Sequence, residues 1–203
     1  MKPSLLVHIF IFVLITTLCF SAPLSINLGI NGGWNHCVVD FSNERLENHT
    51  SNGLHGGIMA GYNIRPYLAF NIIPQYKTTS DICGHWPGTD YFYTNLFIPV
   101  IMVVKLKPTH SVSPYLGIGC AVNFQLSGIE RDNEWIIERP IEDLRNDLYF
   151  TTFIGLENKL ARFRIAPEFS FNYNLTDHTG PADSELTKSI YDFDISIGLY
   201  YAL

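Results

Sequence analysis

Polar and apolar residues alternate along several segments of the sequence. Five charged residues fall on the polar side of this alternation and could form one buried network. They are Glu157, Arg164, Glu168, Asp192 and Asp194. Burying a charged group is costly unless the group is paired and hydrogen-bonded. The sequence therefore predicts that these five side chains pair and hydrogen-bond with one another inside the protein.

The histidines are the other side chains that could take part in catalysis. They are expected mostly in loops or turns, at His36, His49, His85, His110 and His178. Nucleophilic hydrolysis needs a nucleophile within hydrogen-bonding reach of a base. None of these histidines stands in a short constellation with Ser and Asp. The sequence therefore predicts no catalytic residue, no cofactor and no enzymatic activity.

Two cysteines fall in the first and second long connections between the expected strands, as His36-Cys37 and Cys83-Gly84-His85. Both connections leave the same side of the expected sheet, so Cys37 and Cys83 could meet. A disulfide between them is a candidate in an oxidising compartment. A zinc site built from the same residues is the weaker alternative, and no metal site is predicted. Cys120 falls on the apolar face of its strand.

The amino terminus has the pattern of a secretory signal peptide. Met1-Lys2 supplies one positive charge, Leu5 to Phe20 contains no charged residue, and small residues follow at Ser21-Ala22. This pattern predicts a cleaved signal peptide over residues 1–22 and one domain over residues 23–203. An uncleaved membrane anchor is the alternative, but the apolar run is shorter than the ~20 residues that a spanning helix requires.

The composition limits the classes of protein to which the chain can belong. The formal net charge is −6, and no basic patch is interleaved with aromatic residues, which argues against a nucleic-acid partner. Only 16% of the residues are Asp, Glu, Lys or Arg. A soluble domain usually has about 25%. The deficit indicates that much of the surface does not face water.

Period-two alternation recurs in eight segments, which predicts eight β-strands. They are residues 24–30, 56–64, 67–76, 91–106, 115–126, 147–158, 163–175 and 190–203. Most are close to the ~9 to 11 residues with which a tilted strand crosses a bilayer. The segment 91–106 is apolar on both faces and contains Pro99, so its register stays open at this point.

The connections between these segments alternate between long and short. Long polar connections follow the first, third, fifth and seventh segments, and short ones follow the second, fourth and sixth. Outer-membrane barrels have long external loops and short periplasmic turns in this order. The third long connection also carries Trp135, Ile136 and Ile137, whose apolar side chains could contact a partner or ligand.

The two faces of the segments have different compositions. The polar face is rich in glycine and asparagine, which suits a narrow closed interior better than a water-exposed strand surface. Aromatic residues on the apolar face lie near strand ends, where a girdle would meet lipid headgroups. This set consists of Tyr62, Tyr76, Phe163, Tyr173, Tyr191 and Tyr201.

The last eight residues, SIGLYYAL, resemble the carboxy-terminal assembly signal of Gram-negative outer-membrane barrels. The resemblance rests on Ser196, Gly198, Tyr201 and Leu203, where many such signals end in Phe instead. Further segments resemble the PorT-like outer-membrane β-barrel family common in Bacteroidetes. They are YLAFNIIPQYKT, FYTNLFIPVIMVVKL, SPYLGIGCAVNFQLS and DISIGLYYAL. The resemblance implies an OmpA/OmpX-like barrel that the outer-membrane assembly machinery inserts.

We therefore expect an all-β protein, an eight-stranded antiparallel up-and-down transmembrane β-barrel in the cell outer membrane. Its partners would be outer-membrane lipid, the barrel assembly machinery and an unknown ligand or protein at the external loops. Its role would be structural, adhesive or binding. Two alternatives remain, a secreted lipocalin-like barrel with an apolar ligand inside and a lipid hydrolase acting at the outer rim.

Overall fold

The computed structural model describes residues 25–41, 49–81, 89–132, 137–140, 146–176 and 188–203. The predicted signal peptide lies outside these ranges and stays a prediction. Within them, no helix has the length and apolar character that crossing a membrane demands.

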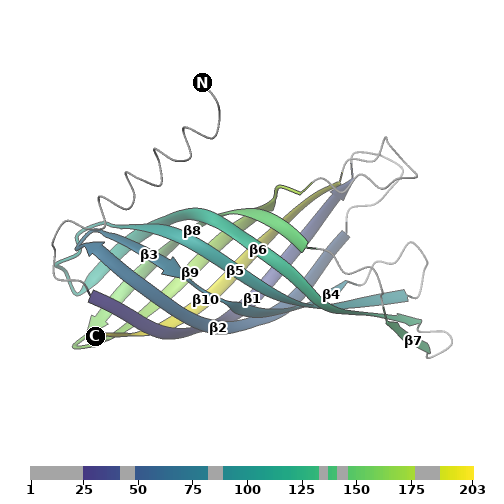
Figure 1. The fold of residues 1–203 in the computed structure, drawn as a ribbon, viewed down its shortest axis with the longest axis horizontal. Helices are drawn as coiled ribbons and strands as arrows, with labels where there is room; N and C mark the ends of the chain where they lie inside the picture. The colour runs from purple at the N-terminus through teal and green to yellow at the C-terminus, as the bar shows by residue number, and fades with distance from the viewer. Residues whose placement is uncertain (1–24, 42–48, 82–88, 133–136, 141–145, 177–187) are drawn as a thin grey trace, which may run out of the picture.

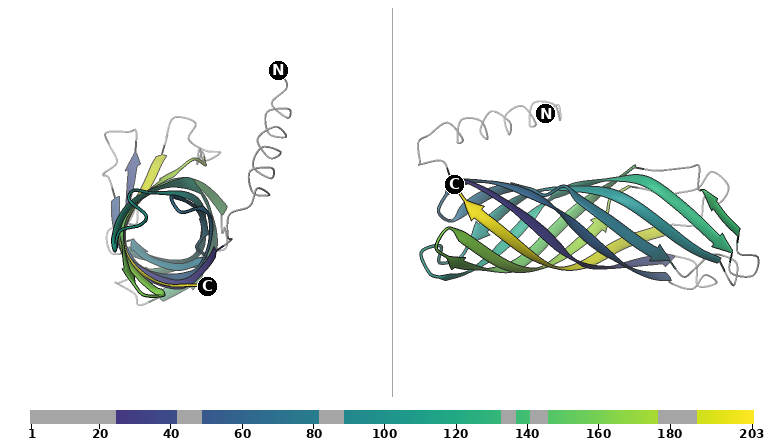
Figure 2. Two further views of the ribbon diagram at one scale, coloured as in Figure 1. Left: turned by 90° about the vertical axis from the view of Figure 1, so that its left-hand side faces the viewer. Right: turned by 90° about the horizontal axis from the view of Figure 1, so that it is seen from below.

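The described residues form ten β-strands and are all-β. The strands are β1 Ser25–Phe41, β2 His49–Arg65, β3 Leu68–Ile72, β4 Gln75–Asp81, β5 Thr89–Lys105, β6 Val112–Asp132, β7 Ile137–Pro140, β8 Asn146–Leu160, β9 Phe163–Asn174 and β10 Lys188–Ala202. Every pairing between them is antiparallel, and β10 pairs with β1 as well as with β9. The sheet therefore closes on itself, as the view along its axis shows (Figure 2).

The ring contains eight strand positions, as the sequence predicts. The segments β3 and β4 together form one position, because both lie between β2 and β5. The short strand β7 pairs with the far end of β6, beyond the ring (Figure 1). Neighbours in sequence are neighbours in the ring, which makes the barrel up-and-down.

The interruption between β3 and β4 lies beside a proline of β5. Pro99 has no backbone N–H, and its carbonyl oxygen accepts a hydrogen bond from the amide of Ile73 at 3.1 Å. Both backbone groups of a strand residue point to the same neighbouring strand. The missing donor of Pro99 therefore faces the place where Ile73 and Pro74 leave the regular ladder. Pro74 also lacks an N–H, and its carbonyl oxygen accepts a hydrogen bond from the Ile58 amide of β2 at 3.1 Å, so its missing donor faces β2. The two prolines therefore interrupt the hydrogen bonding on both sides of this strand position.

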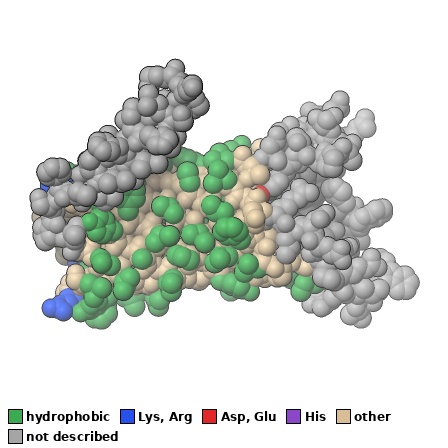
Figure 3. Space-filling view, in the orientation of Figure 1, with side chains coloured by type: hydrophobic (Ala, Val, Ile, Leu, Met, Phe, Trp, Pro, Cys, Tyr) green, Lys and Arg blue, Asp and Glu red, His purple; other side chains and the backbone are tan. Residues whose placement is uncertain are grey.

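The two faces of the strands separate as the sequence predicts. Outward-facing residues are apolar and exposed, among them Ile58 at 65%, Ile197 at 62% and Ile30 at 59% of their surface. On the face seen in Figure 3, hydrophobic side chains cover the strands and basic side chains gather at the end with the short turns. Inward-facing residues include buried Asn, Asp, Glu and Lys. The lipocalin-like alternative is wrong, because its apolar face would line the interior.

The register of β5, which the sequence left open, follows the same rule. Phe97, Ile101 and Val103 point inward and are 2% exposed, whereas Val100 and Val104 point outward. Ile101 and Val103 pack with Tyr115, Phe153 and Tyr200 from other strands, and Phe97 packs with Ala121 and Tyr149. The inner face of β5 therefore belongs to the apolar packing of the lumen, which explains why β5 has two apolar faces.

Aromatic rings gather on the outer surface toward both ends of the barrel. At the short-turn end, Phe163 and Tyr201 meet edge to face with ring centroids 5.3 Å apart. Toward the other end, Phe171 lies 5.4 Å from Phe193, and Tyr191 and Phe169 extend this cluster. Such rings suit the two interfaces between lipid and water.

Three aromatic rings in the lumen each lie against a glycine directly opposite on a paired strand. The pairs are Tyr115 with Gly155, Phe153 with Gly117 and Tyr200 with Gly29. A Cβ at each of the three glycines would lie 2.4 Å from a carbon of the opposite ring. The glycines therefore make room for rings that fill the narrow interior, in the alternation of small and large residues that small barrels require.

This packing predicts that Gly155→Ala destabilises the barrel, because the added Cβ forces the Tyr115 ring out of its place. We expect a loss of about 1–3 kcal/mol in the free energy of unfolding. The matched control is Gly56→Ala, where the nearest atom to the new Cβ is the Asn31 carbonyl oxygen at 3.8 Å. Urea unfolding in detergent measures both. Equal effects of the two substitutions would contradict the packing account.

Candidate functional site

Eight charged residues of the lumen lie in three clusters along its axis. The mouth cluster, at the short-turn end, consists of Lys105, Glu157, Lys159 and Arg164. The central cluster consists of Tyr115, Glu168, Ser196 and Tyr200. The loop-side cluster, toward the long connections, consists of Lys77, Ser170, Asn172, Asp192 and Asp194. These three clusters form the candidate functional site.

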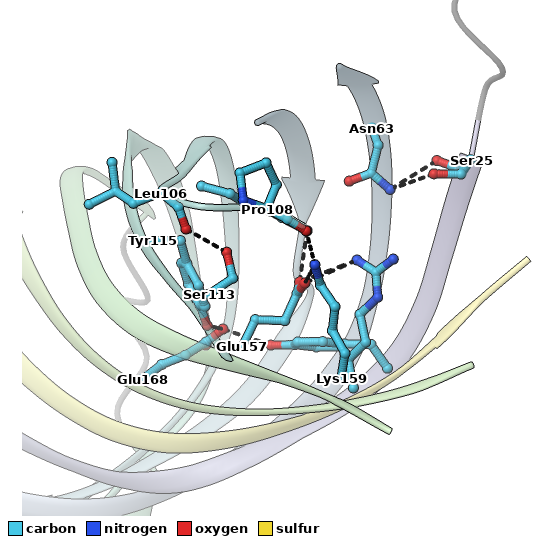
Figure 4. Close-up of polar contacts among 12 residues, drawn as sticks. Ser25, Asn63, Leu106, Pro108, Ser113, Tyr115, Glu157, Lys159 and Glu168 are labelled. Carbon is cyan, nitrogen blue, oxygen red and sulfur yellow. Dashed lines mark hydrogen bonds and ion pairs between the residues drawn. The ribbon is translucent and has the colours of Figure 1, made fainter. Parts of the chain in front are cut away.

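In the mouth cluster, one carboxylate faces three cations. Glu157 is 2.7 Å from the Lys105 ammonium, 3.3 Å from Arg164 and 3.8 Å from Lys159. Lys159 also donates a hydrogen bond to the carbonyl oxygen of Pro108 in a short turn (Figure 4). The side chains of Glu157 and Lys105 are nearly fully buried, so their attraction is less screened than that of a surface pair.

In the central cluster, a carboxylate is held by hydroxyl groups. The Tyr115 and Tyr200 hydroxyls donate to Glu168 Oε1 at 2.5 and 2.7 Å, and the Ser196 hydroxyl lies 3.4 Å from Oε2. Hydrogen bonds to a charged acceptor are shorter and stronger than neutral ones. The two phenols therefore anchor Glu168 at the middle of the lumen.

In the loop-side cluster, one lysine forms ion pairs with two aspartates. The Lys77 ammonium lies 3.0 Å from both carboxylate oxygens of Asp194 and 3.5 Å from Asp192. Asp194 also accepts hydrogen bonds from Asn172 at 2.9 Å and Ser170 at 3.0 Å. The ammonium sits 4.4 Å from the centre of the Phe97 ring, a cation–π contact. Lys77 thus connects β4, β5 and β10.

The structure places all five predicted charged residues in the lumen but divides them among the three clusters. Arg164 meets Glu157, whereas Asp192 and Asp194 meet a cation that the sequence analysis assigned to a loop, Lys77. Lys105 was overlooked as well. Lys77 continues the alternation of the predicted strand 67–76 beyond Gln75, and Lys105 follows Val103 at the same spacing within the predicted strand 91–106. This alternation is the signal that identifies both as inward-facing.

The strands at the loop end are longer than predicted. His36 and Cys37 lie on β1, and Lys77 lies on β4, although the sequence predicts all three in long connections. The prediction was wrong because strand pairing continues through polar residues that no longer alternate cleanly. His55, for which the sequence predicts no role, is buried in the lumen, and neither ring nitrogen has a hydrogen-bond partner among the described residues.

Cys37 and Cys120 lie on opposite faces of the wall. Cys37 points inward, opposite Ser51 on β2 and Asp192 on β10. Cys83 lies outside the described residues, so the disulfide stays a prediction. Cys120 is exposed on the outer surface, as predicted. In the described part of the chain, no group of His, Cys, Asp and Glu could hold a metal ion.

The residues of the carboxy-terminal signal all lie on or just after β10. Ser196 points inward beside Glu168, and Gly198 lies against the Tyr200 hydroxyl. Tyr201 points outward, and the Leu203 amide donates to the Ile26 carbonyl oxygen at 2.9 Å. The last strand is thus the one that meets β1. Recognition of this strand by the outer-membrane assembly machinery stays a prediction.

Side chains leave little open space in the middle of the lumen. A cavity on each side of Glu168 has a volume of about 20 Å³. A cavity of this size accommodates about one water molecule. A larger cavity of about 320 Å³ opens at the mouth cluster.

The fold resembles that of solved outer-membrane barrels. Neisserial surface protein A aligns with a TM-score of 0.56 and 16% identity over 86% of this chain and 96% of that one. A major outer membrane protein from Thermus thermophilus aligns with a TM-score of 0.56 and 10% identity over 90% and 100%. No family model matches the chain, and no curated protein matches it in sequence. The fold and the apolar outer surface are together those of an outer-membrane β-barrel, and the likeness to the PorT-like family stays a resemblance.

The loop-side cluster predicts that Lys77→Met strongly destabilises the barrel, because two buried carboxylates lose their cation. Breaking a buried pair from one side costs about 3–5 kcal/mol. Urea unfolding of the refolded protein measures the loss.

The control for this prediction is Lys107→Met in an exposed turn, which should change stability by less than about 0.5 kcal/mol. Adding Asp194→Asn to Lys77→Met should recover part of the loss, because one unpaired charge disappears. A double variant that is no more stable than Lys77→Met alone would contradict the ion-pair account.

Proposed function

We propose that the chain is an integral outer-membrane protein without enzymatic activity, whose barrel anchors external loops that bind a ligand or partner. The observation that carries this proposal is the arrangement of the wall, with apolar side chains outside and charged side chains inside. Charges on the lipid face of a barrel are costly, whereas paired charges in the lumen are tolerated. The outer surface of the barrel is therefore suited to a lipid environment.

The filled lumen favours an anchor over a diffusion pore. The central cluster crosses the interior from β6 to β9 and β10, and the cavities beside it hold about one water each. An eight-stranded barrel has an interior just wide enough for side chains to fill. Solute passage would require Glu168 and its two phenols to separate.

Several strands are longer than a bilayer crossing requires, which favours a barrel that holds its loops outside the membrane. A tilted strand crosses the bilayer in ~9–11 residues. β1, β2 and β5 have 17 residues each, and β6 has 21. The excess lies toward the long connections, where β6 and β7 extend past the ring (Figure 1). The paired strands would therefore carry the loops beyond the lipid headgroups.

The proposed partners follow from the same arrangement. Outer-membrane lipid would cover the outer face, the barrel assembly machinery would engage β10, and a ligand or protein would meet the loops. A rim-active lipid hydrolase is the less supported function. Two of the described histidines lie away from the outer rim, His55 inside the lumen and His110 in the short turn after β5, and the His36 ring contacts the Asn52 side chain.

Surface labelling tests the proposed orientation and display. An epitope tag inserted within residues 82–88 should be accessible on intact Gram-negative cells, whereas a tag in the turn after Lys107 should become accessible only after the outer membrane is opened. The protein should fractionate with the outer membrane and change its gel mobility on boiling. Extraction without detergent, or labelling of the turn on intact cells, would overturn the proposal.

The lipid-facing assignment predicts that Ile197→Arg impairs folding into bilayers. An arginine on the lipid face of a barrel costs about 2–4 kcal/mol near the bilayer midplane. The matched control, Tyr67→Arg, lies in the turn after β2 and should cost less than about 1 kcal/mol, because that turn lies at the interface or beyond it. The folded fraction on unboiled gels after refolding into vesicles reports both. Similar yields would contradict the assignment.

A further inference from the structure

The mouth cluster lines an open cavity that the anchoring role does not use. This cavity has a volume of about 320 Å³, at the lower end of the range for small-molecule sites. It lies between the turn after β2, the turn after β5 and the ends of β8 and β9. Besides the mouth cluster, Ser25, Asn63 and Arg65 contribute to its lining.

The lining carries a surplus of positive charge. Lys105, Lys159, Arg164 and Arg65 are cationic, and Glu157 is the one acid among the residues that line the cavity. Four positive charges against one negative charge leave a formal surplus of three. The whole chain has the opposite balance, with a net charge of −6. The cavity is therefore a local positive site on an acidic protein.

The cations are held in place before any ligand arrives. Glu157 draws Lys105, Arg164 and Lys159 to within 2.7 to 3.8 Å of its carboxylate. The side chains of Arg164 and Lys159 keep 18% and 25% of their surface exposed, so both can still reach a ligand. One carboxylate cannot neutralise three neighbouring cations, and their mutual repulsion is weakly screened in a partly buried site. A bound anion would relieve it.

The donor chemistry of the cavity fits a phosphate group. Arginine presents a planar fork of N–H donors that matches phosphate oxygens, and lysine supplies a point charge. The Asn63 amide and the Ser25 hydroxyl, which bond to each other at 2.8 Å, add neutral polar groups across the opening (Figure 4). The volume leaves space for a small polar group beyond the phosphate.

We propose that the mouth of the barrel at the short-turn end binds a phosphate group borne by a small polar molecule or by a lipid headgroup. Lys159, Arg164 and Arg65 contact the phosphate, and Glu157 positions the first two. The inference concerns this cavity alone and does not depend on the binding role proposed for the loops.

Calorimetric titration of the refolded protein in a zwitterionic detergent tests the site, with sn-glycerol 3-phosphate as the probe and glycerol as its uncharged counterpart. We expect saturable binding of the phosphate ester, no binding of glycerol, and weaker binding at higher salt. Lys159→Gln and Arg65→Gln should each raise Kd about tenfold, the effect of losing one hydrogen bond to a charged group.

The matched control is Arg162→Gln. It removes the same charge at the same end of the barrel, but Arg162 does not line the cavity and instead contacts the Tyr201 hydroxyl at 3.2 Å. Its Kd should stay within about twofold of the parent, a change of less than about half a kcal/mol. Unboiled electrophoresis establishes that each variant is folded. Equal weakening by Arg162→Gln, equal binding of glycerol, or no saturable binding to the folded parent overturns the proposal.

Reconstitution distinguishes the two sources of the phosphate. The same titration is made in bilayer discs of phosphatidylcholine alone and of phosphatidylcholine mixed with phosphatidic acid or with a fatty acid at equal surface charge. If phosphatidic acid raises the Kd for glycerol 3-phosphate more than an equal surface charge of a fatty acid does, a lipid headgroup occupies the site; an equal effect of the two identifies a soluble phosphate ester. Binding in detergent that is lost in every one of these bilayers overturns the proposal, because the mouth is then inaccessible in a membrane.

Discussion

Closure of the ring between β1 and β10 is the contact on which the rest of the structure depends. In lipid, every backbone N–H and C=O must find a partner within the protein, so a sheet with free edges cannot span a bilayer. The two strands pair continuously from Asn27 opposite Ala202 to Phe41 opposite Lys188. This pairing explains why the last residues of the chain form a full strand. The register of the closed ring fixes which side chains share a face, and the apolar face of each strand then points outward to the lipid.

Closure of the ring also limits which side chains can occupy the lumen. Eight strands leave a narrow interior that cannot hold bulk water, yet half of the side chains must enter it. Aromatic rings fit in the lumen because glycines lie opposite them. Charged side chains are tolerated there because each cluster supplies opposite charges or hydroxyl donors. Polar and apolar side chains are thus packed side by side in the lumen, with β5 supplying Phe97, Ile101 and Val103 to the apolar part and β8 to β10 most of the charged part.

The sequence predicted the strand positions and their two faces well, because period-two alternation reports burial directly. It predicted the acids of the lumen for the same reason. It could not assign their partners, since a residue's neighbour across the lumen depends on strand tilt and register, which no local pattern encodes. Lys77 shows the limit: its alternation with Gln75 was visible, but its place opposite Asp194 follows only from the closed barrel. The interruption at Ile73 and Pro74 likewise depends on Pro99 of a different strand.

The three clusters differ in charge along the barrel axis. The loop-side cluster has one lysine against two aspartates, a formal surplus of one negative charge. The mouth cluster has three cations against one carboxylate, a formal surplus of two positive charges. Because the barrel wall and the surrounding lipid screen charges poorly, this separation produces a field along the lumen that favours cations at the loop end and anions at the short-turn end. The filled interior between them prevents the two ends from neutralising each other by exchange of ions. The two clusters therefore keep opposite charge preferences, and the wall that anchors the protein also makes the two parts of its lumen chemically different.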